Sequence, residues 1–269
     1  MRILYIAPYF GQHKYAYLKR MCESMGAVYP GEQALAATQE TVIPFAGGPA
    51  RPDGHSGGDI FLRNNNTDNI GFTRAINLGI HYGLEHGYDL LWSGNDDLEF
   101  PDIAATLRAI TEEFSNNPKT GIAGCQLVYT EEPDFIYHGG TTRAFPTGWH
   151  KSGRRSLCDL SVRTKERWVA GGCMIVSRAC AQTVGLMDEH FFNIASDSDY
   201  CYRARLAGYD VVYLPTPVMH PRGSMTQKQD STSATGRAQE ERMRQDVEYF
   251  AQKWMQGGVF TELDSGPLS

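Results

Sequence analysis

The sequence lacks the marks of several large classes of protein. Its six cysteines form no C-x-x-C pair, which argues against a zinc framework or a disulfide scaffold. No apolar run approaches the about 20 residues that a membrane-spanning helix needs. We therefore expect a soluble, cytoplasmic protein with reduced thiols and no stable membrane insertion.

An excess of basic residues is also missing. Lys and Arg number 25 against 31 Asp and Glu, so the net charge is -6 and the isoelectric point is near 5.8. Nucleic-acid binders usually carry a basic excess, so a broad polyanion-binding surface is not expected. The glycine-rich stretch 46–59 contains neither G-x-x-x-x-G-K-[ST] nor G-x-G-x-x-G, which argues against a P-loop and a dinucleotide site.

What is present is an alternation of strand and helix patterns. Short apolar runs predict strands over 3–7, 41–45, 60–63, 89–92, 122–128, 168–176 and 211–214. Apolar positions three and four residues apart predict helices over 13–25, 71–87, 178–184 and 197–207, and over 101–114 with Pro101 in the first turn. This order predicts an α/β fold with a mainly parallel sheet flanked by helices.

The alternation breaks after residue 128. Residues 130–167 predict an irregular inserted segment with short strands such as 135–138. We expect one domain over 1–225, followed over 226–269 by a mobile linker and a helix packed on that domain. This helix carries Met243, Val247, Phe250 and Trp254 on one face, so we expect a packing or subunit contact there and no part of an active site.

Two adjacent carboxylates follow the strand predicted over 89–92, in the sequence Asn95-Asp96-Asp97. Ligands of open parallel sheets bind beyond the carboxyl ends of the strands. Carboxylate oxygens suit Mg²⁺ or Mn²⁺, which commonly complete their shell with substrate phosphates. The alternative is that this turn only caps the helix that begins near Pro101.

A second acidic cluster, Ser196-Asp197-Ser198-Asp199, precedes the helix predicted over 197–207. One carboxylate could take the proton of an attacking hydroxyl, or Asp197 or Ser196 could simply cap the helix. His220 could be a further metal ligand through a neutral imidazole, although a lone histidine near a strand end is commonly structural.

Polar and glycine positions recur around these clusters in a fixed order. They are Asn69, Ile70, Gly71, Phe72, Ala75, Asn77, Gly79, Asn95, Asp96, Pro101 and Asp102, then 171–175, 184–192, Asp197, Ser198, Asp199, Arg203, Gly208, Tyr209 and His220. The joint pattern resembles the family 2 glycosyltransferases of GT-A fold, notably their rhamnosyltransferase-like branch. It covers residues 60 to 225.

The resemblance implies roles for the matching positions. Asp96 and His220 are implied to bind a Mn²⁺ or Mg²⁺ ion, with Asp97 as a second candidate. Asp197 matches the catalytic base, and Asp199 its partner on the same loop. The positions implied to contact the donor are Asn95, Asp97, Asn69, Gly71, Arg74 and Gly172.

Two departures from the family pattern concern the substrates. Ser196 stands where the family has Glu, which removes one carboxylate from the acceptor side. The family's strand that ends in an Asp-rich turn for the nucleotide base is here 42–45, which runs into Ala46-Gly47-Gly48-Pro49. Neither Asp53 nor Asp59 stands in the expected place, so the residue that contacts the base is not assigned.

The resemblance implies an inverting, metal-dependent hexosyl- or pentosyltransferase. It would move a sugar from a nucleotide diphosphate sugar to a hydroxyl of a glycan, lipid-linked glycan or other polymer. The alternatives are a degenerate, non-catalytic sugar-nucleotide-binding module, and a metal-dependent nucleotidyltransferase or phosphohydrolase.

Segment 143–167 is positive within this acidic chain. It predicts either a solvated face or a contact with an anionic acceptor, a nucleic acid included. The positive and negative residues of the segment are Arg143, His150, Lys151, Arg154, Arg155, Arg163, Lys165 and Arg167 against Asp159 and Glu166.

Overall fold

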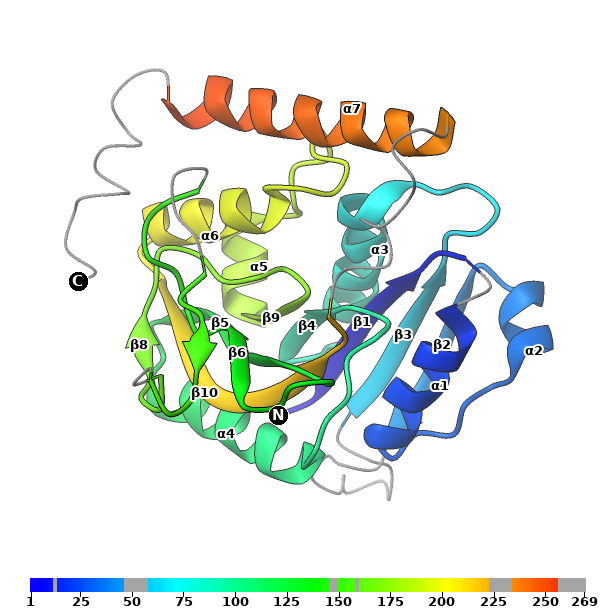
Figure 1. Ribbon diagram of the computed structural model, residues 1–269, viewed down its shortest axis with the longest axis horizontal. Helices are drawn as coiled ribbons and strands as arrows, with labels where there is room; N and C mark the ends of the chain where they lie inside the picture. The colour runs from blue at the N-terminus through cyan, green and yellow to red at the C-terminus, as the bar shows by residue number, and fades with distance from the viewer. Residues whose placement is uncertain (12–13, 46–57, 146–149, 158–159, 223–233, 256–269) are drawn as a thin grey trace.

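The computed structural model describes residues 1–11, 14–45, 58–145, 150–157, 160–222 and 234–255 (Figure 1). One mixed sheet runs through the molecule in the order β2-β3-β1-β4-β9-β5-β10-β8, and β6 and β7 extend it beside β5. The strands are β1 (Ile3–Tyr9), β2 (Glu40–Phe45), β3 (Gly58–Asn64), β4 (Leu90–Gly94), β5 (Thr120–Tyr129), β6 (Phe135–His138), β7 (Gly153–Arg154), β8 (Thr164–Lys165), β9 (Cys173–Ser177) and β10 (Asp210–His220).

The predicted fold class is confirmed. Strands β1, β3, β4, β5 and β10 run in one direction, whereas β2, β8 and β9 run against their neighbours. The helices are α1 (Tyr15–Ser24), α2 (Glu32–Ala37), α3 (Gly71–Glu85), α4 (Ile103–Asn116), α5 (Arg178–Val184), α6 (Ser196–Leu206) and α7 (Ala234–Phe250), which continues as a π-helical turn, η2 (Ala251–Met255).

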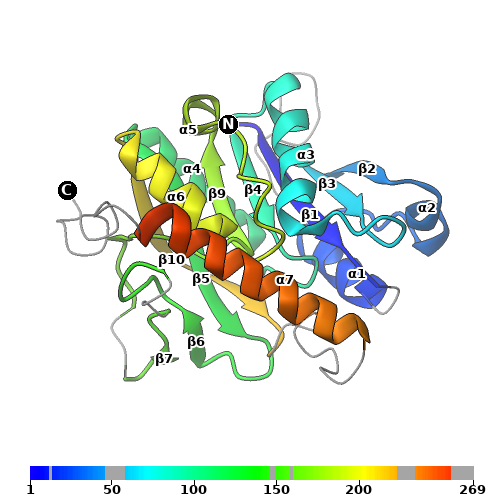
Figure 2. The ribbon, with the colours of Figure 1, turned by 90° about the horizontal axis from the view of Figure 1, so that it is seen from above.

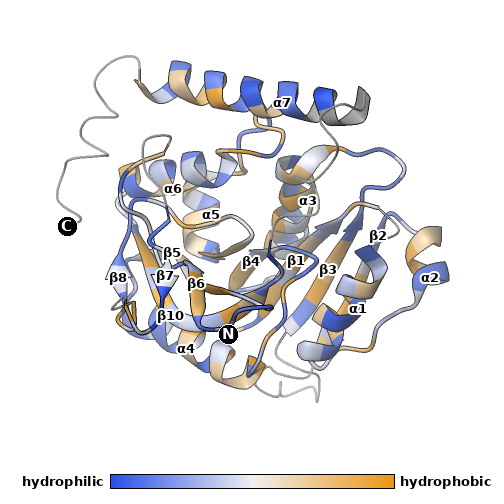
Figure 3. Cartoon of the chain, viewed as in Figure 1, coloured by the Kyte–Doolittle hydropathy of each residue, from blue (hydrophilic) through white to orange (hydrophobic). Residues whose placement is uncertain are grey.

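Both faces of the sheet are buried, because strand side chains alternate between two hydrophobic clusters. In β1, Ile3 and Tyr5 join the cluster that includes α1 and α4, whereas Leu4 and Ile6 join the one that includes α3, α5 and α6. Figures 1 and 2 show α7 on the outer side of the layer of α3, α5 and α6, and Figure 3 shows apolar residues concentrated in the strands. The fold therefore leaves the ends of the strands, and not their faces, for a ligand.

Three predicted elements differ from the structure. The strand predicted over 168–176 begins only at Cys173, because Gly171 and Gly172 form a turn before it. The strand predicted over 211–214 extends as far as His220. Helix α4 is capped by Asp102, whose Oδ1 accepts a 2.8 Å hydrogen bond from the Ala105 amide, so Pro101 precedes the helix.

Phe250 at the end of α7 and Trp254 in η2 are buried in the hydrophobic cluster that includes α3 and α6. The linker predicted to be mobile lies mostly outside the described residues. The five described cysteines are free thiols, as expected. Among the described residues no helix combines the length and apolar character needed to cross a bilayer.

The close approach of α3 to β1 depends on a glycine and gives a stability prediction. A Cβ at Gly79 would lie 2.3 Å from Ile6 Cγ2, so we expect Gly79→Ala to lower the free energy of unfolding by about 1–3 kcal/mol through overpacking. In an exposed helix the same change would stabilise by about 1 kcal/mol. Urea unfolding measures the sign, with His81→Ala on the exposed face of α3 as control. A more stable Gly79→Ala protein would contradict this packing.

Candidate functional site

A cavity of about 740 Å³ opens at the carboxyl ends of β1, β3 and β4. Five parts of the chain form its walls: the loops that follow these three strands, the turn at Phe192 and the first half of α7. The polar residues that line it are Lys14, Asn65, Asn66, Thr67, Asp68, Asn69, Asn95, Asp96, Asp97, Asn193 and Arg242. The cavity thus lies where a doubly wound sheet binds its ligand.

The side chain of Tyr5 supports the acidic turn 95–97 that follows β4. The Tyr5 hydroxyl donates a 2.8 Å hydrogen bond to the Asn95 carbonyl, and its ring fills the space that a side chain at Gly94 would occupy. The Asn95 amide donates to the Gly172 carbonyl at 3.0 Å. These contacts fix Asp96 and Asp97 on the floor of the cavity, where both are buried.

Lys14 lies between the two carboxylates, although sequence reasoning did not single it out. Its Nζ is 3.1 Å from Asp96 Oδ1 and 2.8 Å from Asp97 Oδ2, and the residue is 4% exposed. Burial alone would lower the pKa of Lys14, but the two carboxylates raise it, so the ammonium stays charged. Burial raises the pKa of Asp96 to about 7; the Lys14 ammonium lowers this pKa, and the neighbouring Asp97 carboxylate raises it.

His220 lies beside this ion pair at the end of β10. Its Nδ1 is 2.8 Å from the Pro221 carbonyl, which assigns the ring proton to Nδ1. Its Nε2 then accepts from Asn95 Nδ2 at 3.1 Å and lies 3.3 Å from Asp97 Oδ1. The buried Asp97 Oδ1 and Asp96 Oδ2 have no hydrogen-bond partner within the part of the chain that the structure describes.

The residue types at this site suit a divalent ion, but their arrangement does not fit one. The ammonium of Lys14 stands between the carboxylates, and the imidazole lone pair is engaged by Asn95. Within the described ranges no three His, Cys, Asp or Glu residues converge on a metal position. The predicted Mn²⁺ or Mg²⁺ ion on Asp96 and His220 therefore stays a prediction.

Asp197 lies on the other side of the Gly171-Gly172 turn from Asn95. Its Oδ2 accepts from the Gly171 amide and its Oδ1 from the Ser198 amide, both at 2.8 Å. A Cβ at Gly171 would lie 2.9 Å from Asp197 Cβ, so this glycine lets the carboxylate approach. Burial raises the pKa of Asp197, despite these hydrogen bonds.

Tyr137, which sequence reasoning missed, lies near both acidic groups. Its ring centroid is 5.5 Å from that of His220, and the charges of Asp97 and Asp197 both act on its hydroxyl. Burial is the main reason that its pKa is raised. The half-buried phenol therefore lies near both acidic groups.

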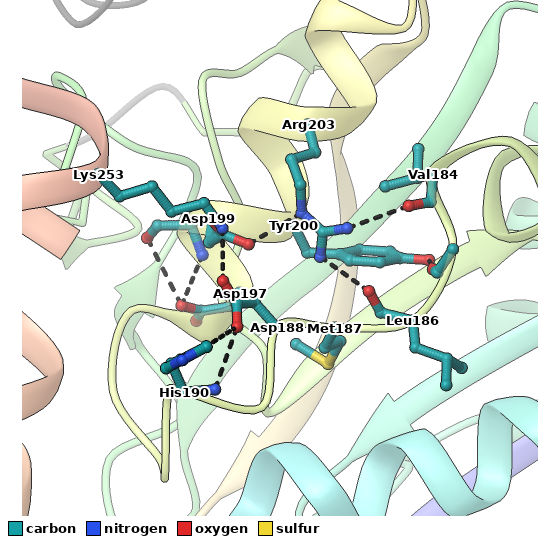
Figure 4. A network of polar contacts seen from close by, with 12 residues as sticks. Val184, Leu186, Met187, Asp188, His190, Asp197, Asp199, Tyr200, Arg203 and Lys253 are labelled. Atoms are coloured by element: carbon teal, nitrogen blue, oxygen red, sulfur yellow. Dashed lines mark hydrogen bonds and ion pairs between the residues drawn. The ribbon is translucent and has the colours of Figure 1, made fainter. Parts of the chain in front are cut away.

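Asp199 belongs to a different network, which ties α6 to the end of α7 (Figure 4). Its Oδ1 accepts from Lys253 Nζ at 2.7 Å and from Trp254 Nε1 at 2.9 Å, and its Oδ2 from Arg203 Nε at 2.9 Å. Lys253 also contacts Asp188 at 2.6 Å. Although partial burial would raise it, hydrogen bonds from Lys253 and His190 hold the pKa of Asp188 well below its usual range.

Of the remaining residues predicted to contact the donor, two line the cavity and two do not. Asn69 and Gly71 line the cavity, and Gly71 has a φ of 84° that favours glycine. Gly172 packs against the Asn95 side chain, because a Cβ at Gly172 would lie 2.9 Å from the side-chain amide group of Asn95. Arg74 lies on the exposed side of α3, with its Nε 3.4 Å from Glu189 Oε2.

The direction of β2 explains why the residue that contacts the nucleotide base could not be assigned from the sequence. Because β2 is antiparallel to β3, its last residue Phe45 pairs with Gly58 at the amino end of β3, away from the cavity. Asp59 lies at that same end and accepts a 2.6 Å hydrogen bond from the Tyr88 hydroxyl. Asp53 lies outside the described residues. The loop 65–69 after β3 forms the wall instead.

Four of the basic side chains of segment 143–167 form ion pairs. Lys151 pairs with Glu166 at 2.7 Å, Arg163 with Glu113 at 2.7 Å, and Lys165 with Asp210 at 3.0 Å. Arg154 pairs with Glu132 at 2.7 Å. These four positive charges are thus compensated by separate carboxylates.

Helix α7 forms one wall of the cavity, contrary to the expectation that it serves packing alone. Ala238, Arg242 and Met243 line the cavity, and Arg242 lies over the Phe192 ring at 4.3 Å. One helical turn later, the buried Asp246 accepts 2.8 Å hydrogen bonds from the amides of Phe192, Asn193 and Ile194. This carboxylate fixes α7 over the site.

Comparisons with known proteins agree with the fold. A search of protein-family models finds no match. An uncharacterized protein of Sinorhizobium fredii, y4gI, is 25% identical over 173 residues, which are 60% of this chain and 18% of that protein. This relative therefore extends far beyond the matched region.

Three similar crystal structures are of glycosyltransferases. GalNAc-T7 with UDP, GalNAc and Mn²⁺ has a TM-score of 0.58 at 11% identity, over 100% of this chain and 52% of its own. A mannosyltransferase of Pyrobaculum calidifontis with GDP-Man and Mn²⁺ has a TM-score of 0.52 at 14% identity, over 95% of this chain and 65% of its own. S. aureus TarS 1-349 has a TM-score of 0.51 at 9% identity, over 96% of this chain and 74% of its own. The chain therefore has the fold of GT-A glycosyltransferases and spans about half the length of GalNAc-T7.

The contact of Asp246 gives a prediction for α7. We expect Asp246→Ala to lower the free energy of unfolding by about 2 kcal/mol or more, because three partly buried amides lose their acceptor. In the Asp246→Ala protein, the backbone amides of α7 should exchange hydrogen faster than those of α4. Urea unfolding and hydrogen exchange measure both effects.

The control is Glu248→Ala on the same helix, whose carboxylate makes only an exposed ion pair with Arg244 among the described residues. Such a pair contributes at most about 1 kcal/mol. Equal exchange of α7 in both variants would show that Asp246 does not hold the helix.

Proposed function

We propose that this protein is a glycosyltransferase that moves a sugar from a nucleoside diphosphate sugar to an acceptor hydroxyl with inversion. The observation that carries the proposal is the cavity at the carboxyl edge of a GT-A sheet, with an acidic pair on its floor. Asp197 does not line this cavity but lies on the other side of the Gly171-Gly172 turn from Asn95. The similar structures that contain UDP or GDP-Man support a nucleotide-sugar donor.

The donor lies in the cavity in this proposal, with its base toward the loop 65–69. Asn69 and Gly71 bound the sugar-nucleotide, and Asn95 and Asp97 form its floor. Arg242 supplies a positive charge from α7 for the diphosphate, which a planar guanidinium can bind through two hydrogen bonds. The rhamnosyltransferase-like assignment stays a prediction.

Asp197 is the base in this proposal. Its carboxylate takes the proton of the acceptor hydroxyl while the hydroxyl oxygen attacks the anomeric carbon and the bond to the diphosphate breaks on the opposite face. Half-burial and a raised pKa suit this role, since a base is most effective when its pKa approaches the working pH. Asp199 supports it by anchoring α6, which Asp197 shares.

We expect Asp197→Asn to keep donor binding and to lower turnover by about 10²–10⁴-fold. Because the folded-state pKa is raised, wild-type turnover should fall on the acid side at a pH above about 3.9, the ordinary value for Asp. Release of nucleoside diphosphate over a panel of acceptors measures this. Residual activity of Asp197→Asn should lack that acid limb.

The matched variant is Asp199→Asn, which should lower stability through the Lys253 and Arg203 contacts yet keep the acid limb of the pH profile. Undiminished turnover of Asp197→Asn would contradict its assignment. Release of nucleoside monophosphate in place of diphosphate would point to a phosphohydrolase, and donor binding without turnover to a non-catalytic module.

Arg242 gives a separate prediction for donor binding. We expect Arg242→Ala to weaken binding of a nucleoside diphosphate by about 10-fold or more, since a charge-assisted hydrogen bond contributes about 1.5–3 kcal/mol. Calorimetric titration measures the affinity. The control is Arg244→Ala, an exposed arginine of the same helix that pairs with Glu241 and Glu248. Equal affinities of the two variants would remove Arg242 from the site.

A further inference from the structure

We propose that Lys14 is the resident cation of this site: its ammonium pairs with the two acidic side chains and stabilises the departing diphosphate, in the place where a divalent ion is expected. The inference rests on the proposed function. It concerns the stabilisation of the departing diphosphate. The resemblance assigns this role to a metal ion, which the observed arrangement of side chains does not fit.

The position of Lys14 carries the proposal. The side chain comes from the end of the loop after β1, 82 and 83 residues away from the two carboxylates that it contacts. Lys14, Asp96 and Asp97 are 4%, 6% and 3% exposed, so all three ionisable groups have been removed from water. Burial of this kind is tolerated only with close pairing, and so the contact is part of the folded site and not an incidental surface pair.

An ammonium, and not a divalent ion, is paired with the acidic side chains in the structure, although Asp96 Oδ2 and Asp97 Oδ1 have no hydrogen-bond partner among the described residues. The His220 lone pair that would bind a metal already accepts from the Asn95 amide. A divalent ion on Asp96 and His220 would have to displace Lys14 and break that hydrogen bond. If Lys14 stayed, two cations would occupy one small, buried space and repel each other.

Lys14 also has the reach to act on a ligand. It lines the cavity itself, with the Tyr17 ring centroid 5.5 Å from its Nζ. An ammonium has three N–H groups, and two of them are directed to Asp96 and Asp97. The structure gives this ammonium no third hydrogen bond among the described residues, and in the proposal its third N–H binds a phosphate oxygen in the cavity. Arg242 also lines the cavity, so two positive charges are near the diphosphate in the proposal.

The chemical step balances without a metal. The acceptor oxygen forms a bond to the anomeric carbon, and its proton goes to Asp197. The bond from that carbon to the diphosphate oxygen breaks, and its electron pair stays on the leaving oxygen. Lys14 donates a hydrogen bond to this oxygen and keeps its proton, so it stabilises the developing charge as an electrostatic group.

The first experiment uses the wild-type protein alone. Binding of UDP and GDP is measured by calorimetric titration after EDTA treatment and again with added Mn²⁺ or Mg²⁺, together with transfer activity. We expect affinity and turnover to change less than about threefold, because the protein supplies its own cation. Nucleotide binding that requires the metal would overturn the role of Lys14 and leave the proposed function intact. Binding under neither condition would overturn both.

The second experiment uses Lys14→Met and Lys14→Arg, with Lys19→Met on the exposed side of α1 as control. We expect Lys14→Met to bind nucleoside diphosphate about 10–100-fold more weakly in EDTA, and added Mn²⁺ to recover part of the loss through the vacated carboxylates. Lys14→Arg should retain more affinity than Lys14→Met. A folded Lys14→Met protein with undiminished affinity in EDTA would overturn the proposal. Circular dichroism checks the fold, and the wild-type titration decides the matter if Lys14→Met does not fold.

Discussion

The contact of Lys14 with Asp96 and Asp97 is the constraint on which the site depends. Two adjacent carboxylates cannot stay buried and ionised without a nearby cation, because the cost of desolvating them is large. Lys14 meets this need from the loop after β1, which is the parallel neighbour of β4. Tyr5 then supports the same turn from within β1. The geometry of the acidic floor is thus set by the pairing of β1 with β4.

The turn at Phe192 joins the start of α3 to α7, the helix that forms one wall of the cavity. Its carbonyl accepts from the amide of Phe72 at the start of α3, and its own amide donates to Asp246 of α7. Arg242 lies on its ring. The same turn thus anchors the two elements that bound the cavity on this side, so a shift of α7 would move the cavity wall and Arg242 together.

Much of the fold follows from local pattern, and the site follows only in part. Apolar runs located β1 and β5, and spacing located α5 at the observed residues, because these signals are local. The position of the acidic pair at a strand end could also be predicted from the sequence. The contact of Lys14 with this pair could not be predicted, because its partners are more than 80 residues away and its loop carries no motif. The direction of β2 and the role of Arg242, on a helix face that looks solvated, depend on tertiary packing.

The run of asparagines after β3 shows why a polar motif at a strand end does not by itself identify ligand contacts. Asn64 donates to the Leu35 carbonyl at 2.8 Å, and Asn65 to the Gly71 carbonyl at 3.4 Å. Asn66 accepts from the Gly11 amide. These side chains hold the loop to its neighbours, which buried polar groups must do. The wall of the cavity is therefore preorganised before a nucleotide binds, and the ligand gains affinity because it does not have to order the loop itself.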